Sequence, residues 1–333
     1  MSVALPRLGL GTAPIGNLFT QVSERDAAAT VAAAAAEGMT YFDTAPRYGH
    51  GVAEDRLGRA LADGVMDGAM DGAADGATPG TAPGTAPGTA PRAAPRAAPG
   101  VVISTKAGWL LRPGQRVITD WSERGLRESL ESSLRRLRRP AVDVLFLHDP
   151  DDFREEIRRT GYPAARRIRE EGLAGAIGFG MNHCEPLAAY VAEFEPDVVL
   201  IAGRFSLLDH DALTTLLPLC AKTGTTVVVG GVFNTGLLAD PRPGAMFHYR
   251  ETPPEVLARA RRCRAICAEF GVPLAAAALR FPYLHPAVGS VVVGCRSAEE
   301  VRANAAAARA EIPPELWHRL AAEGFVPSEL LEG

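Results

Sequence analysis

The sequence predicts an α/β fold, a closed (β/α)8 barrel of the TIM type, on three observations. Short apolar runs that are typical of buried strands alternate with helical segments along most of the 333 residues. The alternation yields eight strand–helix units, a number that favours a closed barrel over an open doubly wound sheet. The strand segments are apolar at nearly every position, as expected when helices cover the outer face and packed side chains fill the inner face.

The strands are predicted from apolar runs that lie between turn and cap signals. In chain order they span residues 8–11, 40–43, 101–105, 142–147, 175–180, 198–201, 226–229 and 290–293. The helices are predicted from apolar residues at helical spacing between a polar start and a glycine or proline stop. They span residues 23–37, 53–61, 122–137, 163–171, 183–194, 212–223, 254–270, 274–281 and 298–308. Ser23 is the expected N-cap of the first helix, Gly38 its stop, and Pro140 closes the third.

One segment, from about residue 67 to residue 100, breaks this alternation. It runs into Gly-Thr-Ala-Pro units at 80–83, 84–87 and 88–91. Such a segment has few large side chains to bury, so it cannot offset the entropy lost on ordering. We therefore expect one barrel domain over residues 1–333, interrupted by a disordered loop between the second helix and the third strand. Loops of this kind lie on the face opposite the carboxyl ends of the strands.

The composition argues against several classes of partner. The net charge is −4, and no basic stripe is present, which argues against nucleic acid as a partner. No run of about 18 apolar residues is available to span a membrane. The first residues lack the apolar core of a signal peptide. We expect a cytoplasmic protein that acts on a small molecule.

The five cysteines are scattered along the chain at Cys184, Cys220, Cys263, Cys267 and Cys295. The pair at 263 and 267 lies on a helical segment without a second Cys or His pair nearby, so no metal site is expected. Free thiols in a reducing compartment are the expected state of all five.

Four polar residues lie at or just beyond the ends of three consecutive predicted strands. Asp43 ends the second strand and Tyr48 follows it, while Lys106 and His148 come directly after the third and fourth strands. The carboxyl ends of barrel strands meet on one rim, where barrels of this type build their active sites. Each residue alone is more often a cap or a solvated group than a catalyst. Their joint occurrence at successive strand ends favours a catalytic site.

These four side chains suit proton transfer to or from a carbonyl or alcohol oxygen. An unperturbed phenol has a pKa near 10, too high for proton exchange at neutral pH. We expect the Lys106 ammonium to lower the pKa of Tyr48, which would act as the general acid or base. Asp43 would hold Lys106 charged and in place. His148 would orient the substrate oxygen through a hydrogen bond.

The Asp-x4-Tyr-Gly motif that begins at Asp43, together with Lys106 and His148, resembles the catalytic tetrad of the aldo-keto reductase superfamily. A closer likeness is to its aldose-dehydrogenase branch, which includes D-threo-aldose, L-fucose and pyridoxal dehydrogenases. The segments that carry this likeness are 177–182, 200–209, 228–238 and 277–282. The resemblance implies a nicotinamide dinucleotide bound without a Rossmann domain. The sequence agrees, since no Gly-x-Gly-x-x-Gly motif follows any predicted strand.

The resemblance also implies which residues contact the cofactor: Gly11, Thr12, Asp43, Asn182, Gly236, Leu238, Gly294, Arg296, Ser297, Glu300 and Asn304. The start of the last helix fits this role, because exposed amides at a helix N-terminus can receive a phosphate. Glu300 stands where relatives that prefer NADPH often carry an arginine. A carboxylate there repels a 2′-phosphate, while Arg296 would attract it. We expect NAD to be preferred over NADP.

The likeness to the aldose-dehydrogenase branch predicts an NAD(P)-dependent oxidoreductase. The expected reaction oxidises an aldose or pyridoxal-type cyclic hemiacetal to its lactone. Phe19, Trp109 and Phe205 are the expected walls of the substrate pocket. One alternative is an NADPH-dependent reductase of aldehydes or ketones. Another is a non-catalytic, nucleotide-sensing regulatory subunit, against which the intact set of four residues argues. The sequence leaves the substrate and the oligomeric state open.

Overall fold

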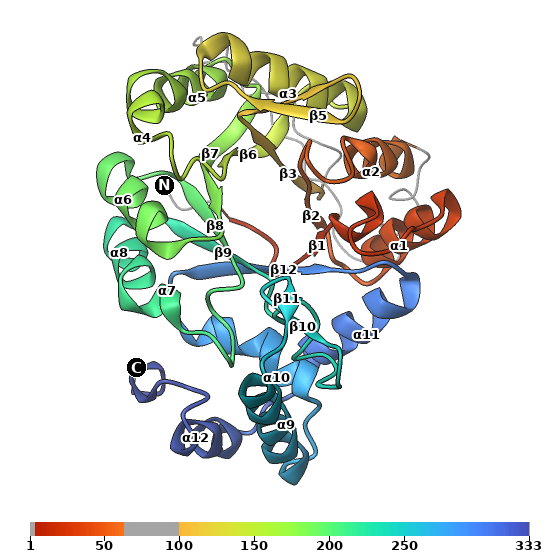
Figure 1. Ribbon diagram of the computed structural model, residues 1–333, viewed down its shortest axis with the longest axis vertical. Coiled ribbons are helices and arrows are strands. Elements are labelled where there is room, and N and C mark those ends of the chain that lie inside the picture. Colours follow the sequence, from red (N-terminus) through yellow and green to blue (C-terminus); the bar gives the residue numbers. More distant parts are fainter. Residues whose placement is uncertain (1–3, 63–99, 333) are drawn as a thin grey trace, which may run out of the picture.

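The computed structural model describes residues 4–62 and 100–332. Parallel strands close into a barrel in the order β1-β12-β9-β8-β7-β6-β3-β2, and helices ring the barrel (Figure 1). The barrel strands are β1 (Leu8–Gly11), β2 (Tyr41–Asp43), β3 (Val102–Ala107), β6 (Val142–His148), β7 (Ala174–Met181), β8 (Val198–Ala202), β9 (Thr226–Gly230) and β12 (Val288–Gly294). The predicted (β/α)8 fold is confirmed.

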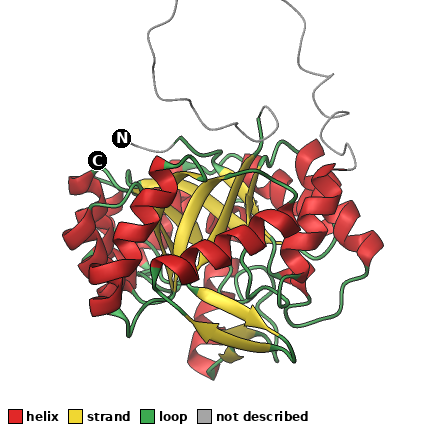
Figure 2. Ribbon diagram, turned by 90° about the horizontal axis from the view of Figure 1, so that it is seen from above, coloured by secondary structure: helices red, strands yellow, loops and turns green. Residues whose placement is uncertain are grey.

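Helices pack against the outside of the strands, as the side view shows (Figure 2). They are α1 (Glu24–Ala36), α2 (Val52–Ala62), α3 (Glu123–Leu137), α4 (Arg154–Glu156), α5 (Tyr162–Glu170), α6 (Cys184–Phe194), α7 (Asp211–Thr214), α8 (Leu216–Thr223), α9 (Pro254–Glu269), α10 (Leu274–Arg280), α11 (Ala298–Arg309) and α12 (Pro314–Ala322). Short helical turns occupy Pro14–Gly16 (3-10), Ile157–Gly161 (π), Phe281–Leu284 (3-10) and Ser328–Leu330 (3-10). Ser23 and Ser122 cap α1 and α3 through their side chains, as predicted for Ser23.

Most predicted boundaries lie within two residues of the observed ones, and the differences have local causes. Strands β3 and β6 run on through Lys106 and His148, so both residues lie within strands rather than beyond them. The predicted helix over 212–223 is two helices, α7 and α8. Pro218 lies in the first turn of α8, where its missing N–H and its ring cannot continue a helix from α7.

Two hairpins and two helices, α4 and α12, were not predicted. The hairpin after β3 pairs β4 (Trp109–Arg112) with β5 (Arg116–Thr119), and the hairpin after β9 pairs β10 (Met246–Phe247) with β11 (Arg250–Glu251). Their strands are short and mostly exposed or half-buried, so they lack the apolar run that marks a barrel strand. Helix α12 packs against α9 outside the barrel.

Alternation along the strands decides which side chains face the barrel interior. Tyr41, Val144, Phe146, Val198, Leu200, Val228 and Val292 belong to the inner cluster, whereas their neighbours in sequence join the larger outer core. Side chains in a strand point alternately to its two faces. Asp43 is therefore in phase with inward-facing Tyr41, and His148 with inward-facing Phe146. The interior ends in polar groups at the carboxyl rim.

Two sequence-based expectations concern the remaining features. All five cysteines are buried and free, as expected. The expected disordered insertion at about 67–100 lies outside the described residues, apart from Gly100. The described chain stops at Ala62, the last residue of α2, and resumes two residues before β3.

No single helix in the described part of the chain is long and apolar enough to cross a membrane. Only α9 and Leu274–Leu284 counted together, across a 98° bend, reach that length and apolar character.

Candidate active site

A buried ion pair between Asp43 and Lys106 lies at the carboxyl rim of the barrel. Lys106 Nζ donates to both carboxylate oxygens of Asp43, at 2.8 and 2.7 Å, and to the Thr44 carbonyl at 2.9 Å. The two side chains are only 2% and 4% exposed. Ser104 Oγ donates to the same carboxylate at 2.7 Å. The pair holds Lys106 in the barrel interior with a fixed direction.

The charge state of Lys106 follows from this pairing. Burial alone would lower the pKa of its ammonium, but the charge of Asp43, with smaller contributions from Tyr48, outweighs burial, and the net pKa is raised. Lys106 is therefore protonated at neutral pH. The expectation that Asp43 keeps this amine charged agrees with the geometry.

Tyr48 lies beside this ion pair on the turn that follows β2. Lys106 Nζ stands 4.7 Å from the centre of the Tyr48 ring, and the His148 ring meets the Tyr48 ring edge-on with centroids 6.2 Å apart. The turn is held by backbone contact with the 3-10 turn Pro14–Gly16. Gly49 has φ +64°, and a Cβ there would lie 2.1 Å from the Gly16 carbonyl oxygen. Only glycine fits directly after Tyr48.

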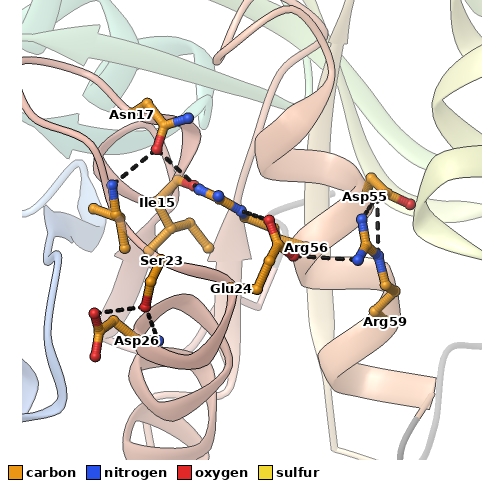
Figure 3. A network of polar contacts seen from close by, with 9 residues as sticks. Ile15, Asn17, Ser23, Glu24, Asp26, Asp55, Arg56 and Arg59 are labelled. Atoms are coloured by element: carbon orange, nitrogen blue, oxygen red, sulfur yellow. Dashed lines mark hydrogen bonds and ion pairs between the residues drawn. The ribbon is translucent and has the colours of Figure 1, made fainter.

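Arg56 of α2 ties the loop after β1 to α1 and to α2, the helix that follows the Tyr48 turn (Figure 3). Its guanidinium donates to the Ile15 carbonyl at 2.6 Å, to Asn17 Oδ1 at 3.0 Å and to Glu24 Oε1 at 2.8 Å. Asn17 Oδ1 also accepts the Val22 amide at 2.9 Å. One buried arginine thus fixes the loop that carries Phe19.

His148 is neutral at physiological pH. Loss of solvation, followed by the positive charges of Lys106 and Arg47, lowers its pKa well below the usual 6.5. Its Nδ1 is buried and has no hydrogen-bond partner among the described residues. Its Nε2 faces the carboxylate of Asp149 at 3.6 Å. This arrangement favours a proton on Nε2, from which His148 can donate a hydrogen bond to a substrate oxygen.

The expectation that the pKa of Tyr48 is lowered is wrong, although the contribution of Lys106 has the expected direction. Lys106 does lower the pKa of Tyr48, but the loss of solvation around the phenol is larger, and Asp43 adds to it. The pKa is raised to about 12. Tyr48 is therefore a phenol at neutral pH, ready to donate a proton, and becomes a base only as the pH rises.

Residues of the β12–α11 unit that were expected to bind the cofactor lie together. Ser297 caps α11 by accepting the Glu300 amide, and Arg296 donates its Nε to Glu300 Oε1 at 2.9 Å and its amide to Oε2 at 2.9 Å. Asn304 Nδ2 lies 3.3 Å from Cys295 Sγ. Gly294 pairs in register with Gly11, which brings that residue to the same edge.

This unit fits the anionic part of a dinucleotide. The Ala298 and Glu299 amides in the first turn of α11 have no hydrogen-bond acceptor within the described part of the chain. Free amides at the start of a helix attract phosphate, because the helix dipole adds to their partial positive charge. The residues present therefore match a bound pyrophosphate or ribose.

The other expected cofactor residues are spread around the rim and already have partners. Thr12 donates its amide and its hydroxyl to the Asp43 carbonyl, at 2.9 and 3.0 Å. Asn182 Nδ2 donates to Asp149 Oδ1 at 3.1 Å. The Gly236 and Leu238 amides both donate to the Phe233 carbonyl at 3.0 Å, and Leu238 is fully buried. These two residues support the loop after β9 in this structure.

The expected pocket residues divide into two at the rim and one in the core. Trp109 Nε1 donates to the His148 carbonyl at 2.6 Å, and Phe19 is 55% exposed. Phe205 is fully buried and packs against Phe281, with ring centroids 4.8 Å apart. The expectation that Phe205 walls the pocket is wrong, because its side chain turns outward between the barrel and the helices.

Sequence reasoning missed three residues at the mouth of the site. Arg47 stacks on Trp109, 4.3 Å from the ring centre, and reaches Asp149 at 3.7 Å. Tyr249, at the tip of the β10–β11 hairpin, stacks on Phe19 with centroids 6.0 Å apart. Arg47 and Asp149 could have been predicted as site residues, because they are next to Tyr48 and His148 in the sequence. Nothing in the local sequence indicates the contact of Tyr249.

Comparison with known proteins agrees with this fold. A family model described as Aldo/keto reductase family matches residues 7–322. The chain is 36% identical to a D-threo-aldose 1-dehydrogenase from a Pseudomonas species, over 98% of this chain and 96% of that protein. It is 37% identical to a pyridoxal 4-dehydrogenase from Microbacterium luteolum, over 96% and 94%. The chain belongs to the aldo/keto reductase family and is an oxidoreductase of that family, whose members use nicotinamide cofactors.

Solved structures show the same fold at lower sequence identity. An aldo-keto reductase from Bacillus halodurans in its holo form superposes with a TM-score of 0.72 at 22% identity, covering 95% of this chain and 91% of that chain. A glycerol dehydrogenase from Gluconobacter oxydans gives a TM-score of 0.70 at 21% identity, covering 97% and 92%. These two likenesses concern the barrel alone.

Replacing Tyr48 by phenylalanine removes the hydroxyl while keeping the ring that packs beside Lys106. We expect turnover to fall by about 10²–10⁴-fold, the usual contribution of a general acid or base. The dissociation constant for the nicotinamide dinucleotide, measured by calorimetry, should stay close to that of the wild type. Tyr162→Phe is the matched control, since that tyrosine lies in an aromatic cluster behind β7. Tyr48→Phe retaining more than about a tenth of the activity would rule out the assignment.

Proposed function

We propose that this protein oxidises the cyclic hemiacetal form of an aldose, or of a pyridoxal-like aldehyde, to the corresponding lactone. The observation that carries the proposal is the constellation of Tyr48, His148 and the Asp43–Lys106 pair at the barrel rim. The two relatives of 36% and 37% identity support it, since one is named for aldose and one for pyridoxal oxidation. The bound nicotinamide supplies the two-electron acceptor.

The protein's own residues handle the oxygen and its proton. His148, neutral with its proton on Nε2, donates a hydrogen bond to the hydroxyl oxygen of the hemiacetal and so fixes its position. Tyr48 accepts the hydroxyl proton as the carbon–oxygen double bond forms. Lys106 stabilises the phenolate form of Tyr48 through its positive charge, and Asp43 holds Lys106 in place.

Reduction of an aldehyde or ketone is the second candidate, and one observation favours it. Tyr48 is protonated at neutral pH because loss of solvation raises its pKa to about 12. A phenol is the form needed to donate a proton to a carbonyl oxygen. The same residues can therefore also reduce a carbonyl group to an alcohol, and whether oxidation or reduction is observed depends on the substrate, the pH and the nucleotide supplied.

A spectrophotometric screen tests the substrate class. Purified protein would be assayed for reduction of NAD+ and NADP+ with L-fucose, D-arabinose, L-galactose and pyridoxal, and for oxidation of NADH and NADPH with simple aldehydes. We expect nucleotide reduction with at least one hemiacetal. Turnover with simple aldehydes alone would replace the proposal by a carbonyl reductase, and no turnover at all would point to a regulatory role.

The pH dependence should differ between the two directions. Oxidation needs the phenolate of Tyr48, so log kcat/KM for oxidation should rise with a slope of about 1 from roughly pH 7 to pH 10. Reduction needs the phenol and should stay flat over the same range. His148 titrates well below pH 6.5 and adds no limb near neutrality. An oxidation profile that is flat from neutral to alkaline pH would contradict Tyr48 as the base.

We propose NAD as the preferred cofactor because Glu300 and Arg296 neutralise each other at the start of α11. Arg296 donates to Glu300 through its side chain and its amide. To clamp a 2′-phosphate, the guanidinium would have to leave this carboxylate, which itself repels the phosphate. The repulsion is on the order of 1 kcal/mol at a partly exposed site, equivalent to several-fold discrimination.

Glu300→Arg should reverse this preference. The substitution removes the repulsion and frees Arg296, so kcat/KM with NADP+ should improve about tenfold relative to NAD+. Binding of 2′,5′-ADP, measured by calorimetry, should tighten in parallel. Glu299→Arg is the matched control, because it makes the same charge change on the exposed neighbouring position. Wild-type protein that favours NADP+ in kcat/KM would overturn the proposal and make Arg296 the deciding residue.

A further inference from the structure

Asp149, the residue directly after His148, has a strained backbone at the mouth of the site. Its φ is +47°, in the left-handed region that residues other than glycine rarely adopt. The amide of Asp149 donates to the Gly180 carbonyl at 3.0 Å, which fixes the strained residue to the rim of β7. Strain of this kind, held by surrounding structure, is concentrated at functional sites. The backbone turns the Asp149 carboxylate toward His148 instead of letting it follow the strand.

The carboxylate of Asp149 has unused capacity to accept hydrogen bonds. Its Oδ1 accepts from Asn182 Nδ2 at 3.1 Å. Its Oδ2 lies 3.6 Å from His148 Nε2 and 3.7 Å from Arg47 Nη1, and both contacts are longer than a hydrogen bond. No side chain or amide in the described ranges 4–62 and 100–332 donates a hydrogen bond to Oδ2. The side chain is 21% exposed, so it is mostly but not fully removed from water.

The groups around Asp149 Oδ2 suit a hydroxyl group. Arg47 stands beside it with a side chain that is 42% exposed and a guanidinium that stacks on the face of Trp109. A hydroxyl is at once a donor and an acceptor. It can donate to Asp149 Oδ2 while it accepts from Arg47 Nη1. A carbonyl oxygen or an apolar group at this place would leave the carboxylate without a donor, at a cost typical of an unpaired buried polar atom.

We propose that Asp149, assisted by Arg47, is the specificity residue that recognises the hydroxyl on the carbon next to the one oxidised, so that the substrate is an aldose. This inference rests on the proposed function. The reacting hydroxyl lies at His148 Nε2, and Asp149 Oδ2 is 3.6 Å from that same nitrogen. The oxygen atoms of hydroxyls on adjacent carbons are separated by about the length of a hydrogen bond. The second hydroxyl of an aldose therefore falls beside Asp149 Oδ2.

The hemiacetal of pyridoxal lacks a hydroxyl on the carbon next to the one that is oxidised. The carbon next to its reacting carbon is a ring carbon of the pyridine and bears no hydroxyl. Its phenolic oxygen is one bond further away. Pyridoxal therefore leaves Asp149 Oδ2 without a donor, and the site selects an aldose over pyridoxal.

A different role for Asp149 would be to orient His148 alone. Its negative charge near Nε2 favours the tautomer with the proton on that nitrogen. Such a positioning role would affect every substrate equally, because all of them place an oxygen at His148. Recognition of the neighbouring hydroxyl affects only substrates that carry it. The two roles are therefore separated by a comparison between substrates.

The test is a cycle over two proteins and two substrates. Wild-type protein and Asp149→Asn are assayed with the aldose that turns over best and with its 2-deoxy counterpart, such as D-arabinose with 2-deoxy-D-ribose. Asparagine keeps the shape and tolerates the left-handed backbone, but its amide offers a weaker acceptor. We expect the wild type to favour the 2-hydroxy sugar in kcat/KM by at least about tenfold, and Asp149→Asn to reduce that ratio to below about threefold.

The outcomes separate this inference from the proposed function. Equal losses on both sugars in Asp149→Asn would show a positioning role only and overturn the inference, while aldose oxidation stands. Turnover of pyridoxal but of no aldose by the wild type would overturn the inference and leave the proposed function standing. Turnover of neither aldoses nor pyridoxal would overturn both. Asp151→Asn is the matched control, because it removes a carboxylate from the same loop as Asp149. That carboxylate pairs with His183, so the variant should keep the wild-type ratio. A thermal melt of each variant verifies folding.

Discussion

The buried ion pair between Asp43 and Lys106 is the interaction on which the rest of the site depends. Taking both charges out of water costs more than an apolar pair of the same volume would. The pair is tolerated because Ser104 and the Thr44 carbonyl satisfy the remaining hydrogen bonds. Loss of either partner would leave a charge buried and alone. The geometry of Tyr48 follows from this pair, since its ring lies over the fixed ammonium.

The closed barrel fixes the positions of Asp43 and Lys106, so the ion pair forms at a defined place on the rim. Register between neighbouring strands sets Asp43 opposite Ser104 and Lys106 opposite Phe146. Alternation turns all the polar ends inward, and parallel strands present them at one rim. Tyr48 and Asp149 then extend the site through a glycine-bearing turn and a left-handed residue. The strands thus carry the fixed charges, and the turns carry the groups that meet the substrate.

How far sequence reasoning reached depended on the range of the interactions involved. The strand ends at Asp43, Lys106 and His148 were predictable, because apolar runs and their polar termini are local patterns. Phe205 was misplaced because a loop residue has no periodicity to show which way its side chain turns. The direction of the pKa shift of Tyr48 was also predicted wrongly, because the loss of solvation that raises this pKa depends on residues far apart in sequence. The same holds for Tyr249, which reaches Phe19 from a hairpin more than two hundred residues away.

The positions of the proposed roles along the chain have an evolutionary consequence. Asp43, Tyr48, Lys106 and His148 all belong to the first half of the barrel, whereas the residues proposed to choose between nucleotides, Arg296 and Glu300, lie in the turn after β12 and in the first turn of α11. Helix α11 packs on α1 and α10. On the proposed assignment, descendants of this gene can change their preference between NAD and NADP through substitutions confined to about the last tenth of the chain. Their inherited proton-transfer apparatus need not be rebuilt.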